Sequence, residues 1–67
     1  MRVEVIYDGM YNMWFVDTVM GICRTQELES KSMNLCIKFA KELQQENMCQ
    51  LLVFNEDYEL KKLYKCK

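Results

Sequence analysis

The sequence predicts an α+β fold in which one helix packs on one face of a small antiparallel sheet, in the order β-β-α-β-β. The first observation is an apolar stripe at helical spacing, made by Met33, Cys36, Ile37, Ala40 and Leu43. The second is that the stretches on both sides of this stripe alternate like strands. Because the apolar face of a helix must be buried against another element, we expect a single domain over residues 1–67.

The N-terminal third predicts a hairpin. Residues 2–7 alternate as a half-buried strand does, and the Asp-Gly pair at 8–9 supplies a turn. Residues 12–19 are rich in aromatic and β-branched side chains and predict the second strand. Both faces of this second strand are largely apolar, so it is either covered on both sides or presents one side to another molecule. One face carries Trp14, Val16 and Thr18, and the other Met13, Phe15, Asp17 and Val19.

The middle of the chain leaves two alternatives open. Gly21 can mark a bulge or a bend, after which residues 22–23 either prolong the second strand or begin a short third one. Residues 25–31 are compatible with a helix, although Ser30 or Ser32 can equally cap a later helix start.

We place the helix itself at about residues 30–46, with Asn47 as its C-terminal cap. Leu35 and Phe39 widen its apolar face, so they either grip the rim of the sheet or serve an interface.

The C-terminal third predicts two more strands. Residues 49–54 form a short apolar run typical of a central strand, and residues 55–57 form a turn. The last strand is predicted at 58–64, where Tyr58 has high β propensity. A short helix that uses Leu60 and Leu63 is the alternative for this segment.

Three segments resemble a family of small bacterial and phage domains of unknown function. These segments are Trp-Phe-Val at 14–16, the helix at 36–43 and the strand and turn at 51–57. The sequence departs from the family pattern at Cys36, where a small Ala is usual, and at Tyr58, where the turn usually has Gly. The resemblance implies a β-β-α-β-β domain and no established activity.

Composition excludes several classes of function. A net charge of −1 argues against general attraction to nucleic acid or to an anionic membrane. No apolar run is long enough to span a bilayer and the N-terminus lacks a secretory signal, so we expect a cytoplasmic protein without a membrane contact. In that reducing compartment we expect the cysteines to be free thiols, with Cys36 acting as a small core residue. The four cysteines are Cys23, Cys36, Cys49 and Cys66.

The search for catalytic chemistry indicates that the protein is not an enzyme. Histidine is absent, the acidic residues are scattered, and the two glycines are isolated from one another. A zinc site is disfavoured because the chain has no histidine and no close Cys-x-x-Cys pair. We therefore expect no cofactor and no metal.

Two binding hypotheses remain. The first is a protein-binding module, a regulator or inhibitor encoded by a mobile element, which occludes a partner's surface. It would also form a homodimer, because 51% apolar residues exceed what so small a chain can bury. Its anchors would be Met10, Tyr11, Met13 and Phe15.

The alternative hypothesis is a nucleic-acid-binding accessory protein that uses a C-terminal patch of lysines and tyrosines. We favour protein binding, because the lysines also suit an edge strand that resists aggregation. The patch consists of Tyr58, Lys61, Lys62, Tyr64, Lys65 and Lys67.

Overall fold

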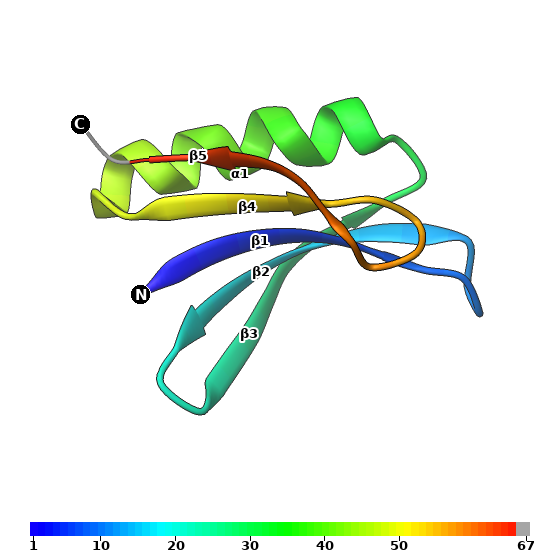
Figure 1. Cartoon of the computed structure of the whole chain (residues 1–67), viewed down its shortest axis with the longest axis horizontal. Coiled ribbons are helices and arrows are strands. Elements are labelled where there is room, and N and C mark those ends of the chain that lie inside the picture. Colours follow the sequence, from blue (N-terminus) through cyan, green and yellow to red (C-terminus); the bar gives the residue numbers. More distant parts are fainter. Residues whose placement is uncertain (66–67) are drawn as a thin grey trace.

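The computed structural model describes residues 1–65, which form one five-stranded sheet with a single helix on one of its faces (Figure 1). This arrangement confirms the predicted α+β class with a helix packed against the sheet. The elements are β1 (Arg2–Asp8), β2 (Met13–Met20), β3 (Cys23–Ser30), α1 (Met33–Asn47), β4 (Gln50–Phe54) and β5 (Leu60–Tyr64).

The sheet has the strand order β3-β2-β1-β4-β5 and is mixed rather than wholly antiparallel. Neighbouring strands run antiparallel except β1 and β4, which are parallel. The parallel pair arises because β3 and α1 together return the chain to the end of the sheet where β1 begins, as a crossover connection does. Our expectation of an antiparallel sheet was wrong at this one pair.

A third N-terminal strand, β3, adds to the expected β-β-α-β-β order. Gly21 adopts a left-handed backbone with φ 60°, and the chain turns back there to pair along β2. Most side chains of β3 are exposed. Leu28, which is partly buried, packs against the core. β3 stays in the sheet mainly because it pairs with β2, since it has few apolar side chains that the core could bury.

The helix begins later than predicted and ends with a different cap. Ser32 is the N-terminal cap, and its side chain accepts a hydrogen bond of 3.2 Å from the Leu35 backbone N–H. At the other end Met48, rather than Asn47, takes the left-handed conformation. Asn47 stays helical, and its Nδ2 donates to the Leu43 carbonyl over 2.9 Å.

The C-terminal segment forms a strand, as predicted, although this strand starts two residues later than expected. Asn55 Oδ1 accepts hydrogen bonds from the backbone N–H groups of Asp57 and Glu59, both at 2.9 Å. These bonds hold a turn in which Tyr58 adopts φ 60°. Tyr58 therefore belongs to the turn and not to β5.

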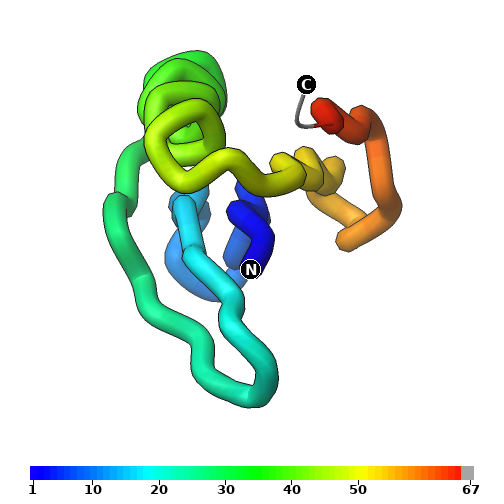
Figure 2. Tube along the Cα trace, turned by 90° about the vertical axis from the view of Figure 1, so that its left-hand side faces the viewer, coloured from blue at the N-terminus to red at the C-terminus, as the bar shows by residue number. Residues whose placement is uncertain are grey.

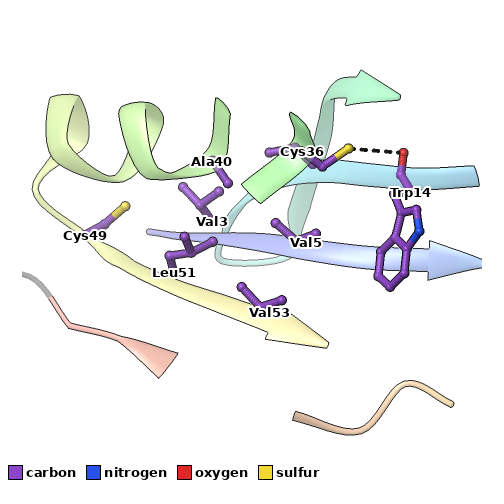
Figure 3. Packing of buried hydrophobic residues seen from close by; sticks show 9 residues of the cluster. Val3, Val5, Trp14, Cys36, Ala40, Cys49, Leu51 and Val53 are labelled. Atoms are coloured by element: carbon purple, nitrogen blue, oxygen red, sulfur yellow. Dashed lines mark hydrogen bonds between the residues drawn. The ribbon is translucent and has the colours of Figure 1, made fainter. Parts of the chain in front are cut away.

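The core lies between α1 and the sheet (Figure 3). Ala40 and Cys36 are fully buried, and Met33, Ile37 and Leu43 pack against the buried cluster, which confirms the helical stripe. The Cys36 thiol lies 3.7 Å from the Trp14 carbonyl, and burial raises its pKa above the ordinary 9.0. The cluster consists of Val3, Val5, Trp14, Val16, Cys36, Ala40, Cys49, Leu51 and Val53.

Candidate functional site

The candidate site is the face of the sheet that points away from α1, here called the open face. Figure 2 shows α1 lying along one side of the sheet, with no helix on the other side within residues 1–65. Successive strand residues point to opposite faces, so the residues between the core positions of each strand belong to the open face. The two largely apolar faces of β2 therefore lie on opposite sides of the sheet. Trp14 and Val16 lie in the core, while Phe15 lies on the open face.

An apolar band crosses the open face from β2 to β5. Phe15 pairs with Ile6 across β2 and β1, and Phe54 pairs with Leu60 across β4 and β5. Phe54 follows Val53, the partner of Val5, and so lies beside Ile6. None of these side chains is fully buried, and Leu60 is 54% exposed. The apolar band is defined as Phe15, Ile6, Phe54 and Leu60, with Leu52 and Leu63 in the next row.

Tyr58 extends the apolar band beyond the strands. Its ring stacks on Phe54 with centroids 4.8 Å apart and an interplanar angle of 17°. A non-glycine residue at positive φ stores about 1 kcal/mol of strain or more, and such residues often mark functional positions. The turn therefore holds an exposed aromatic ring over the open face at a cost in backbone energy.

Two buried carboxylates lie next to the apolar band. Glu4 and Asp17 are direct partners across β1 and β2, and their side chains are only 3% and 8% exposed. Like charges directly opposite one another destabilise a sheet, so this pair needs compensation.

Two arginines supply that compensation. Arg24 Nη1 lies 2.9 Å from Asp17 Oδ2, and Arg24 Nη2 lies 2.9 Å from Glu4 Oε1. The second contact is an ion pair and not a hydrogen bond, because Glu4 Oε1 accepts none from the described residues. Arg2 Nε donates to Glu4 Oε2 over 2.7 Å. These four residues are called the ion cluster.

The pKa of the Arg24 guanidinium is raised, mainly because it donates a hydrogen bond to Asp17. Partial desolvation opposes this effect, while the interaction with the nearby Glu4 carboxylate adds to it. Arg24 therefore stays charged and remains fixed between the two carboxylates.

Both edges of the sheet are unsuited to strand addition. In β3, Leu28 pairs with Val16 and Gln26 with Asp17, so Glu27 is an extra, bulged residue. In β5, a matching shift leaves Lys61 as the bulged residue. Bulges and charged side chains are the devices by which natural edge strands avoid pairing with other chains. Strand addition at either edge is therefore disfavoured.

The four predicted protein-binding residues do not form one patch. Phe15 lies within the apolar band, and Met13 lies at the start of β2 on the same face. Met10 and Tyr11 are exposed in the turn between β1 and β2, beyond the end of the sheet. The prediction did not single out the band residues on β1, β4 and β5, namely Ile6, Leu52, Phe54, Leu60 and Leu63. Their alternation along predicted strands was the available signal.

The predicted nucleic-acid patch is divided between the two faces of the sheet. Tyr58 stacks on the open face, whereas Tyr64 lies on the helix side, where Gln44 Nε2 donates to its carbonyl over 2.9 Å. The two tyrosines therefore form no common stacking surface.

The lysines of this patch are also divided. Lys62 Nζ lies 5.0 Å from the centre of the Tyr64 ring, and Lys41 Nζ, which the sequence reasoning missed, lies 4.7 Å from it. Lys41 and Lys65 line a groove between α1 and β5, whereas Lys61 is the bulged residue of the edge. Lys67 lies outside the described residues.

Within residues 1–65 there is no group of three or more acidic, cysteine or histidine side chains placed to hold a metal ion. Cys23 is exposed, while Cys36 and Cys49 are buried; Cys66 lies outside the described residues. In the described part of the chain, α1 is too short and too polar to cross a membrane.

Comparison with protein-family models finds no family that matches the chain, and searches of curated proteins and of solved structures find no similar protein. The resemblance to small bacterial and phage domains therefore stays a prediction.

Proposed function

We propose that this chain is a non-enzymatic protein-binding module whose binding surface is the open face of its sheet. It would act as a small regulator or inhibitor that occludes the surface of its partner. The observation that carries this proposal is the apolar band, a row of large side chains that crosses four strands without being fully buried.

The composition of the open face supports this proposal. Interface centres are enriched in aromatic side chains and arginine, and the open face offers Phe15, Phe54 and Tyr58 beside Arg2 and Arg24. Each Å² of apolar surface removed from water contributes about 25 cal/mol, so covering the band favours association. The half-exposed arginines retain donors that can contact a partner at the rim of the band.

One observation favours nucleic-acid binding as a second candidate function. The structure adds Lys41 to Lys62 and Lys65 beside the groove between α1 and β5. Against it stand the net charge of −1 and the separation of the two tyrosines. We rank this function second.

Capture from a cell lysate with matched surface variants tests the proposal. Leu60→Glu places a charge in the apolar band, and Leu35→Glu is the control, because Leu35 is similarly exposed (52% against 54%) but lies on α1. We expect Leu60→Glu to lose the captured protein and Leu35→Glu to retain it. Equal capture by both variants would contradict a role of the open face.

Oligonucleotide binding at several salt concentrations tests the second candidate. Contacts from three lysines to phosphates would give a slope of up to about 3 on a double-logarithmic plot. We expect no measurable binding near physiological salt. Salt-sensitive binding that disappears when Lys41, Lys62 and Lys65 are replaced by Gln would favour nucleic acid over protein.

A further inference from the structure

We propose that the groove between α1 and β5 binds a small organic anion, which has a carboxylate or phosphate head on an apolar body. The groove lies on the helix side of the sheet, so this site is separate from the open face and goes beyond the proposed function. Three features of the structure carry the proposal: the space that α1 leaves beside β5, the lysines around Tyr64, and the exposed side chain of Met48.

The groove exists because α1 covers only part of the sheet. α1 packs against β1, β2, β3 and β4, whereas its backbone does not come close to β5. Figure 2 shows α1 and β5 standing apart, with β4 between them. The Gln44 side chain spans this gap, where its Nε2 donates to the Tyr64 carbonyl over 2.9 Å. The groove has a volume of about 720 Å³, within the range of about 300–1,000 Å³ that is typical of small-molecule sites.

The charge of the groove is positive and is not neutralised within residues 1–65. Lys41 and Lys65 line the groove, and its described lining includes no acidic side chain. Lys41 Nζ and Lys62 Nζ lie 4.7 and 5.0 Å from the centre of the Tyr64 ring, so one ring holds two ammonium groups near each other. The ion pairs of the described residues all belong to the ion cluster, so none of these three lysines takes part in one. An anionic head beside Lys41 and Lys65 therefore gains charge-assisted hydrogen bonds without displacing a carboxylate.

Met48 supplies the apolar part of the groove from a strained position. It lines the groove, its side chain is 73% exposed, and its backbone has φ 50°. A helix that ends in a left-handed residue usually has Gly there, because a Cβ is unfavourable in that conformation. Strained non-glycine residues often mark ligand sites, and the apolar body of a ligand would cover this side chain.

The class of ligand follows from these side chains together. A lysine ammonium is a point charge that suits carboxylate and phosphate alike, so the two lysines select for negative charge and not for one head group. The Tyr64 ring packs against the core with lysines over it, so stacking of a nucleotide base would have to displace them. An aliphatic body that contacts Met48 needs no such displacement.

Nuclear magnetic resonance titration of the full chain with octanoate tests the proposal. The six methionines report from different parts of the molecule when their methyl groups carry ¹³C. We expect octanoate to shift the Met48 signal, with a Kd on the order of 1 mM for so small a ligand, and to leave that of Met13 on the open face in place. Octylammonium has the same chain with the opposite charge, and acetate has the head without the chain, so each should bind at least about tenfold more weakly. Shifts centred on Met13, or equal binding of octanoate and octylammonium, would overturn the proposal.

Variants of the groove separate its charge from its apolar part. Lys41→Gln combined with Lys65→Gln should weaken octanoate binding about tenfold. Lys31→Gln is the matched control, because Lys31 is exposed and does not line the groove, and it should bind as the wild type does. Met48→Gly should weaken binding about threefold, measured from the side-chain amide signal of Gln45, and yet raise the urea midpoint, because Gly relieves the left-handed backbone. Opposite changes in binding and stability distinguish a ligand contact from a structural role.

Unchanged octanoate binding in the lysine double variant or in Met48→Gly overturns the assignment of the groove. Oligonucleotide binding that depends on the same lysines, in a chain that does not bind octanoate, would replace the organic anion by nucleic acid. The lysate experiment with Leu60→Glu probes the opposite side of the sheet, so it decides the proposed function independently of these results.

Discussion

Replacing Arg24 with Leu should destabilise the domain by about 2 kcal/mol. Arg24 contacts both buried carboxylates, and its loss leaves Glu4 and Asp17 facing one another across β1 and β2. Arg2 still compensates Glu4, but Asp17 loses the ion-pair partner that the structure gives it. Removing one member of a buried pair costs about 3–5 kcal/mol, and we reduce this figure because the Arg24 side chain is 40% exposed and water can replace it.

Urea unfolding at neutral pH and fixed protein concentration measures this effect. Fixed concentration matters because any self-association would stabilise the folded chain by mass action. With an m-value of about 1 kcal/mol/M for so small a domain, the midpoint should fall by about 2 M. Arg2→Leu is the matched comparison and should cost about half as much, since within residues 1–65 Arg2 forms an ion pair with one carboxylate, Glu4.

A second background shows whether charge is the cause. When Glu4→Gln and Asp17→Asn are already present, Arg24→Leu should cost less than about 0.5 kcal/mol, because no buried charge is left unpaired. An equal cost in both backgrounds would refute the reasoning. It would show that the aliphatic part of the arginine, and not its charge, supports the fold.

Four further predictions concern α1 and the thiols. Ile37→Asp should cost about 3 kcal/mol in urea unfolding, because it places a charge against the core; a melt like that of the wild type would exclude Ile37 from the core. Leu35→Glu should raise the free energy of unfolding by about 0.5 kcal/mol, because a carboxylate three residues after Ser32 completes a capping box; a lower midpoint would contradict this cap. Cys23 should react quickly with a thiol reagent in the folded protein and Cys36 slowly, and mass spectrometry of the labelled peptides distinguishes them. Because the folded-state pKa of Cys36 is raised, stability should fall as the pH rises above 9.0, where the unfolded thiol ionises, and Cys36→Ala should remove this fall.

Local patterns predicted the elements whose own side chains face the core. The stripe through Ile37 and Ala40 indicated α1, and alternation over residues 2–7 indicated β1, because each pattern is a direct record of burial. β3 shows no alternation of buried and exposed residues, because it is an edge strand that is stabilised by its pairing with β2. The parallel pairing of β1 and β4 depends on how far the crossover carries the chain, which no local pattern encodes.

The candidate site was predicted only in part for the same reason. Alternation placed Phe15 on one of the two apolar faces of β2. The position of α1 decides which of these faces is open. The apolar band and the ion cluster exist only once the register is known, because Glu4 and Asp17 are 13 residues apart in sequence and direct partners in the sheet.

Isotope-filtered nuclear Overhauser spectroscopy on a mixture of labelled and unlabelled chains shows whether copies of the chain meet through the open face. We expect contacts between copies from the methyl groups of Ile6, Leu52 and Leu60 on the open face. We expect none from Leu35 on α1. Intermolecular contacts from Leu35, with none from Ile6 or Leu60, would contradict the assignment of the open face as the binding surface.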